Sequence, residues 1–119
     1  MKKLKGLIFT SFIILPFLGF LHYYQIERTI RIQEAVGNAH YENHAYEKAI
    51  TAYEKIKKYK NDDFAFNLML TKLYVEVYNE TESTDAMRRV AEQIEKAYAL
   101  NTTNLEIIAL RKDYLIRDP

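Results

Sequence analysis

Residues 36–62 read VGNAHYENHAYEKAITAYEKIKKYKND, and this stretch decides the fold. Its small and apolar positions recur at intervals of three and four: Ala45, Ala49, Ala52, Tyr53 and Ile56. That spacing places them on one face of an α-helix. A polar break at Asn43-His44 separates this face from the residues before it. The stretch therefore predicts two helices joined by a short turn.

The same spacing continues downstream, and polar breaks again separate the helical stretches. A second apolar face is formed by Met87, Val90, Ala91, Ile94, Ala97 and Tyr98. Thr103 precedes Glu106 by three residues, which is the spacing of a capping box at a new helix start. We therefore expect five helices beyond residue 25, near residues 26–42, 45–59, 64–78, 85–100 and 104–116. Because no stretch shows the alternation of a strand, the predicted fold class is all-α.

The segment from Val36 to Asp62 resembles a tetratricopeptide repeat (TPR), a 34-residue helix-turn-helix unit. In that family a large apolar residue precedes a small one, as Val36 precedes Gly37 here, and small residues let the two helix axes approach. The chain departs from the pattern at His40, where Tyr is preferred, and at Asn61, where Pro is usual. The resemblance implies these packing positions: Val36, Gly37, His40, Ala49, Tyr53, Leu70, Tyr74 and Ala97.

The residue pattern of the first unit recurs 34 residues further along the chain. Leu70, Thr71 and Tyr74 then match Val36, Gly37 and His40. The apolar residues of the second helix of this unit stand seven positions later than a shift of 34 residues predicts. Residues 79–85 therefore hold either an insertion or a longer helix end. The resemblance implies repeats at 30–63 and 64–104 and a capping helix at 105–116. An unrelated bundle of helical hairpins with the same pattern is the alternative.

Domains of this family bind peptides or other subunits in a concave groove that is lined by the first helix of each unit. The resemblance implies these partner-groove residues: Arg31, Glu34, Asn38, Tyr41, Ala65, Leu68, Lys72 and Val75. The alternative is that they form an ordinary solvated face. Two and a half repeats are few for a stable stack, so we expect self-association or a partner.

The N-terminal part has a different composition. Residues 6–24 read GLIFTSFIILPFLGFLHYY and include no Asp, Glu, Lys or Arg. A helix of this length, at about 1.5 Å per residue, roughly matches the hydrocarbon core of a bilayer. We therefore expect a single transmembrane anchor at 6–24 behind a basic flank at 1–5. The basic flank favours a cytoplasmic N-terminus, with the helical domain at 25–119 on the other side of the membrane.

Two other interpretations of this segment remain open. A cleaved signal peptide would need small residues after its apolar core, whereas residues 21–26 are all large. A buried helix of a soluble domain is the second alternative. No Gly or Pro occurs between Phe20 and Val36, so we expect the anchor helix to continue without a break into the first repeat helix.

Charge and chemistry exclude several classes of function. The chain has 17 basic and 16 acidic residues, and three of the Lys belong to the expected flank. The remaining 14 basic and 16 acidic groups give a net charge of −2, which is unlike a nucleic-acid-binding surface. His40 and His44 are four residues apart, but no Cys supports a metal site. We expect no metal, no cofactor, no small-molecule substrate and no enzymatic activity.

The sequence thus predicts a membrane-anchored TPR-like module for protein–protein interaction, acting as a scaffold at the bilayer. The alternative is a small structural subunit of a larger membrane complex, whose span packs against other spans.

Overall fold

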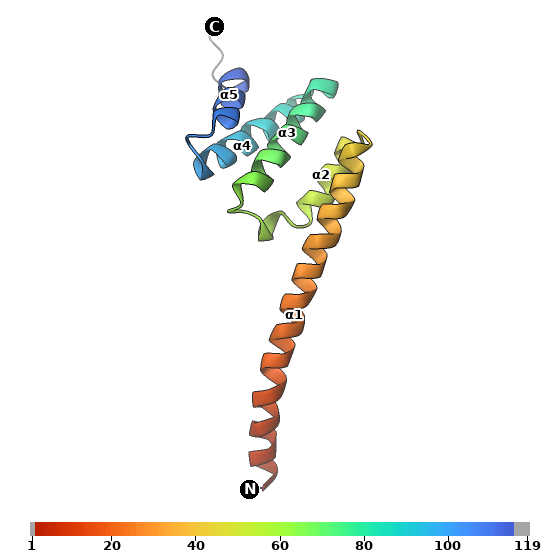
Figure 1. The fold of residues 1–119 in the computed structure, drawn as a ribbon, viewed down its shortest axis with the longest axis vertical. Coiled ribbons are helices and arrows are strands. Elements are labelled where there is room, and N and C mark those ends of the chain that lie inside the picture. Colours follow the sequence, from red (N-terminus) through yellow and green to blue (C-terminus); the bar gives the residue numbers. More distant parts are fainter. Residues whose placement is uncertain (1, 116–119) are drawn as a thin grey trace. The chain divides into compact units, whose positions relative to one another are not determined.

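The computed structural model describes residues 2–115, and it describes the side chains of residues 14–115. Figure 1 shows the order of the elements. They are α1 (Lys2–Glu42), α2 (Tyr46–Glu54), the 3₁₀ helix η1 (Lys57–Tyr59), α3 (Phe64–Thr81), α4 (Thr84–Leu100) and α5 (Leu105–Tyr114). Residues 2–115 contain no strand, so the all-α class is confirmed. The chain divides inside α1 into an N-terminal unit, Met1–Ile32, and a C-terminal unit, Gln33–Pro119.

The N-terminal unit is helical throughout its described residues, and Pro16 lies inside the helix. Helix α1 is unbroken to Glu42, as predicted from the absence of Gly and Pro between Phe20 and Val36. Large apolar side chains are exposed along this unit, including Leu15 at 68% and Phe20 at 66%. Among the described residues, no helix has both the length and the apolar character needed to cross a membrane. The basic flank and residues 6–13 of the expected anchor lie outside the described side chains.

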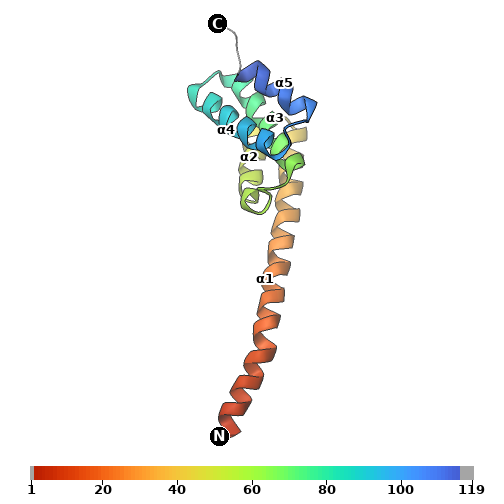
Figure 2. The same cartoon turned by 90° about the vertical axis from the view of Figure 1, so that its left-hand side faces the viewer.

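The C-terminal unit is a series of helices in which each packs on the next. Helix α3 contacts both α2 and α4, and α4 also contacts α5 (Figure 1 and Figure 2). The largest fully buried apolar side chains come from all four helices and from the turn before η1: Ile50, Tyr53, Ile56, Leu70, Leu73, Val90, Ile94 and Ile107. Burial of such side chains is the main stabilising contribution to a small helical domain.

Short polar side chains begin three of these helices. Asp63, Ser83 and Asn104 each accept a hydrogen bond at 3.1 Å from the backbone N–H three residues on. Such caps satisfy N–H groups that the first helical turn leaves unpaired. The capping box expected at Thr103 is wrong: Asn104 caps α5, and the carboxylate of Glu106 forms an ion pair with Lys72 instead.

Two helix boundaries differ from the expected ones. Helix α2 ends at Glu54 rather than near residue 59, because the backbone leaves the α conformation at Ile56 (φ −112°, ψ 1°), whose side chain is fully buried. Helix α3 continues to Thr81, where Glu82 ends it in the left-handed conformation (φ 52°). Residues 79–81 of the expected break are thus part of α3, which accounts for part of the seven-residue offset in the second unit.

Candidate functional site

The first hairpin of the C-terminal unit is closed by contact between Gly37 on α1 and Tyr53 on α2. A Cβ atom on Gly37 would lie 2.5 Å from Cε1 of Tyr53, so only glycine fits against this ring. Tyr53 is fully buried, and its hydroxyl donates a hydrogen bond to Oδ1 of Asn38. Its ring packs edge-to-face on Phe66 of α3, with 5.9 Å between centroids. This packing brings the end of α1 close to the start of α3.

A hollow of about 260 Å³ opens where these elements meet. Helix α1, helix α2, the loop before α3 and the first turns of α3 all contribute to it. We call it the groove hollow, and it is lined by Glu34, Asn38, Tyr53, Lys60, Asp63, Ala65, Phe66 and Met69. It combines the apolar surface of Phe66, Met69 and Ala65 with charged and amide groups.

Charged groups on one side of the groove hollow form a short chain. Lys60 Nζ lies 2.9 Å from Glu34 Oε1 and 3.7 Å from Asp63 Oδ2. The hydrogen bond to Glu34 is the main reason that the pKa of Lys60 is raised. Burial, and secondly the Glu34 carboxylate, raise the pKa of the Tyr53 hydroxyl. With two carboxylates and one ammonium, the groove hollow carries a formal charge of −1.

The structure brings together only part of the predicted partner groove. Glu34, Asn38 and Ala65 line the groove hollow. Further along α3, the half-buried Leu68 and Lys72 lie beyond it, and Lys72 is paired with Glu106 of α5.

Three other predicted groove residues lie elsewhere. Val75 is 7% exposed and therefore belongs to the core. Tyr41 is 43% exposed near the end of α1 and contacts the ring of Tyr46, with 5.9 Å between centroids. Arg31 is exposed and belongs to the N-terminal unit.

Five lining residues were absent from the prediction: Tyr53 as a lining residue, Lys60, Asp63, Phe66 and Met69. Met69 could have been found, because it stands four residues after Ala65 and so shares its helix face. Lys60 and Asp63 gave no such signal. They lie in an irregular loop, where no periodicity predicts the direction of a side chain.

Most of the predicted packing positions are buried. Gly37, Ala49, Tyr53, Leu70, Tyr74 and Ala97 all lie in the interior. Val36, in contrast, keeps 39% of its surface exposed, and His40 is half-buried. These two line a separate hollow of about 210 Å³ beside Lys48 and Lys55. Within the C-terminal unit the first hairpin has a neighbouring hairpin on one side only, which leaves Val36 uncovered.

His44 takes part in a local contact at the turn between α1 and α2. Its Nδ1 lies 2.8 Å from the hydroxyl of Tyr46, and its backbone has a positive φ of 58°. The side chains of residues 14–115 include no group of three or more His, Cys, Asp or Glu residues able to hold a metal ion.

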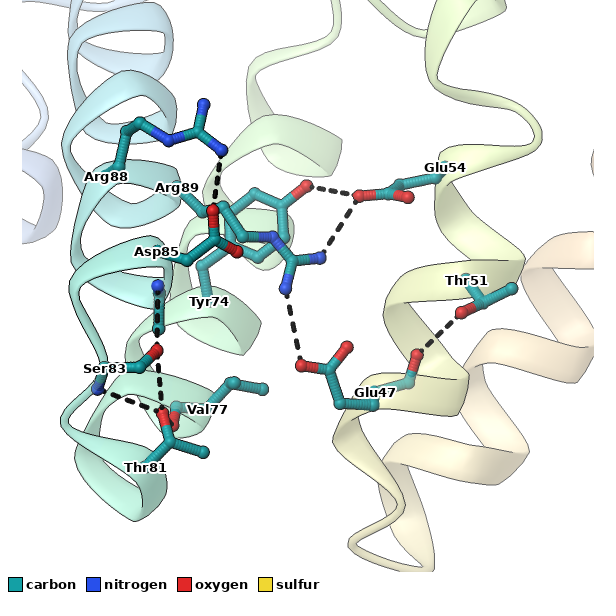
Figure 3. Close-up of polar contacts among 11 residues, drawn as sticks. Glu47, Thr51, Glu54, Tyr74, Val77, Thr81, Ser83, Asp85, Arg88 and Arg89 are labelled. Carbon is teal, nitrogen blue, oxygen red and sulfur yellow. Dashed lines mark hydrogen bonds and ion pairs between the residues drawn. The ribbon is translucent and has the colours of Figure 1, made fainter.

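A second polar cluster ties α4 to α2 across α3 (Figure 3). The guanidinium of Arg89 lies 3.4 Å from a carboxylate oxygen of Glu47 and 3.4 Å from one of Glu54. It also covers the ring of Tyr74 at 4.8 Å, and the Tyr74 hydroxyl donates to Glu54 at 3.0 Å. Burial, and secondly the Glu54 carboxylate, raise the pKa of Tyr74 strongly. One guanidinium thus contacts two carboxylates and a tyrosine ring, and these contacts join α2, α3 and α4.

No protein-family model, curated protein or solved structure matches this chain. The groove hollow offers apolar contact surface beside acidic, basic and amide groups that can donate or accept hydrogen bonds.

Proposed function

We propose that this chain is a membrane-anchored, TPR-like interaction module that recruits or stabilises a protein partner at the bilayer. The observation that carries the proposal is the groove hollow. It is formed where two helical hairpins meet, and its lining mixes Phe66 and Met69 with Glu34, Asn38 and Lys60. Such a lining can bind an apolar side chain and the polar backbone beside it.

The anchor is the second part of the proposal. Its support is the run of 19 uncharged residues at 6–24, together with the Lys residues before it and the Tyr residues at its end. The exposed apolar side chains of residues 14–21 are consistent with a lipid environment. We propose a cytoplasmic N-terminus, with residues 25–119 on the opposite side of the membrane.

The anchor is tested by fractionation. The full chain should remain in the membrane pellet after extraction at high pH, whereas a chain beginning at residue 25 should move to the supernatant. Recovery of the full chain in the supernatant would contradict the anchor, but it would not test the proposed binding of a partner in the groove hollow.

The groove is tested by site-specific photo-cross-linking in the full chain. A photoreactive amino acid at the exposed Ala65 should capture one defined protein, and the same label at the exposed Thr102, in the loop before α5, should not. Glu34→Arg in the Ala65-labelled chain should abolish capture, because it breaks the ion pair with Lys60 and reverses a charge in the hollow. Equal capture from both labels, or capture that survives Glu34→Arg, would contradict a groove-bound partner.

A structural subunit of a larger membrane complex is the second candidate. Its support is Gly19, where an added Cβ would meet nothing within 4 Å, since small residues let membrane helices approach closely. A photoreactive label at Leu15 decides between the two. Capture from Leu15 without capture from Ala65 would favour the subunit over the interaction module.

A further inference from the structure

A hollow of about 310 Å³ lies away from the groove hollow, between α2, η1, α3 and α4. Its lining includes Lys57 of η1 and Lys96 of α4, together with Glu54, Tyr74 and Arg89. We call it the lysine hollow. Its volume is at the small end of the range for ligand sites in proteins.

The acidic groups of the lysine hollow already have cationic partners. Glu54 pairs with Arg89 at 3.4 Å, and Arg89 is paired a second time by Glu47. Glu92, which also lines the hollow, pairs with Arg88 at 3.3 Å. Each arginine is shared between two carboxylates, because Arg88 also pairs with Asp85 at 2.7 Å.

The two lysines are not neutralised in this way. Among the side chains that the structure describes, neither Lys57 nor Lys96 has an ion-pair partner. Lys96 Nζ donates instead to the amide oxygen of Asn61, at 2.5 Å. An amide oxygen accepts a hydrogen bond but brings no negative charge.

The two ammonium groups also act on each other. Burial is the main reason that the pKa of Lys96 is lowered, and the positive charge of Lys57 is the second reason. The carboxylate of Asp62 acts in the opposite direction but more weakly. The hollow therefore holds a repulsive pair of cations, one from each hairpin, which an anion between them would stabilise.

We propose that the lysine hollow binds a phosphoryl group, held between the ammonium groups of Lys57 and Lys96. A phosphoryl group carries several acceptor oxygens and up to two negative charges, so it satisfies both lysines at once. A monocarboxylate has a single charge to share between them. The phosphoryl group belongs either to free phosphate or a small phosphate ester, or to a lipid headgroup. Its binding would join η1 to α4 and stabilise the contact between the hairpins.

The test uses the full chain in a neutral detergent and follows helix unfolding by circular dichroism. A site with a dissociation constant on the order of 5 mM raises the thermal midpoint by about 5 °C in roughly 20 mM phosphate. Sodium chloride and sodium acetate at the same ionic strength are the reference conditions. Detergent micelles that contain phosphatidic acid, without free phosphate, provide the lipid source.

The variants separate binding from folding. Lys57→Gln and Lys96→Gln should lose the response to phosphate, and Lys112→Gln, at an exposed position on α5, should keep it. In chloride, Lys57→Gln and Lys96→Gln should unfold at the same or a higher temperature than the parent, because the repulsion is removed. A response to phosphate or to phosphatidic acid that needs both lysines supports the site and identifies the source. An equal rise in acetate, or a rise that persists in Lys96→Gln, would overturn it.

Discussion

The two hairpins of the C-terminal unit, α1 with α2 and α3 with α4, are closed by different forces. At the position 34 residues after Gly37 of the first hairpin, the second has Thr71. Gly37 admits the ring of Tyr53, which fills the space that a side chain would take. The hydroxyl of Thr71, also fully buried, donates to the carbonyl of Asn67 at 2.7 Å and lies 3.5 Å from that of Gln93.

A buried network of amide hydrogen bonds links the second hairpin to the loop between the two hairpins. Nδ2 of Asn67 donates to the carbonyls of Lys60, Asn61 and Asp63, at 3.2, 3.1 and 2.7 Å. Its Oδ1 accepts a hydrogen bond from Nε2 of Gln93 at 2.9 Å. Asn67 is fully buried and Gln93 is 2% exposed, so these bonds have no competition from water.

Shape complementarity and hydrogen bonding can therefore each hold a pair of helices together. Val36, beside Gly37, keeps 39% of its surface exposed because the first hairpin has a neighbouring hairpin on one side only, whereas Leu70, its counterpart in the second hairpin, is fully buried. The network also fixes the loop that carries Lys60 and Asp63 into the groove hollow. Geometry at the candidate site thus depends on both forms of closure.

The largest expected effect is at the amide network. Asn67→Ala should lower the free energy of unfolding by about 3 kcal/mol, because it leaves the Gln93 amide and the loop carbonyls without their buried partner. Chemical denaturation followed by circular dichroism measures this. Asn79→Ala is the control, since Asn79 is exposed and accepts a single hydrogen bond at 3.4 Å. If the two variants lose similar stability, the network does not close the second hairpin.

Gly37→Val tests the first hairpin. We expect a loss of about 2 kcal/mol, because the new Cβ would lie 2.5 Å from the buried ring of Tyr53. Gly19→Ala is the matched control, since an added Cβ there meets nothing within 4 Å. The same denaturation experiment applies. A fully stable Gly37→Val protein would show that the ring has room to move and that shape does not close this hairpin.

Tyr53→Phe sharpens the same comparison by keeping the ring and removing the hydroxyl. The expected loss is about 1 kcal/mol, from one hydrogen bond to Asn38. Because the ring remains, the loss should be smaller than that of Gly37→Val. A larger loss would mean that hydrogen bonding, rather than shape, holds the first hairpin as well.

The smallest expected effect is on folding stability at alkaline pH. The pKa of Tyr74 and that of Tyr53 are both raised in the folded chain, mainly by burial. In the unfolded chain these hydroxyls lose their protons near pH 10, while the folded chain retains them, so stability is complete below about pH 10 and falls above it. Tyr74→Phe should flatten this fall, and Tyr53→Phe should flatten it less.

Denaturation midpoints between about pH 8 and pH 11 measure this effect, with Tyr59→Phe, at an exposed position, as the control. If the midpoint of Tyr74→Phe falls with pH as steeply as that of the parent, the burial of Tyr74 does not contribute to the alkaline loss of stability.

Much of the secondary structure could be predicted from the sequence, because helix formation depends on neighbouring residues. The spacing of Ala49 and Tyr53, or of Val90 and Ile94, was sufficient to predict α2 and α4. Glu34, Asn38 and Ala65 were predicted as groove residues and do line one hollow. The end of α2 was not predictable, since it depends on the burial of Ile56 by other helices.

The all-α class followed from the sequence by itself, because it depends on helical periodicity. What only the tertiary structure decided was which distant groups meet. Lys60 faces Glu34, Lys72 faces Glu106, and Lys57 shares a hollow with Lys96. Each pair spans more than 25 residues, and no local pattern specifies a contact that depends on how whole helices pack.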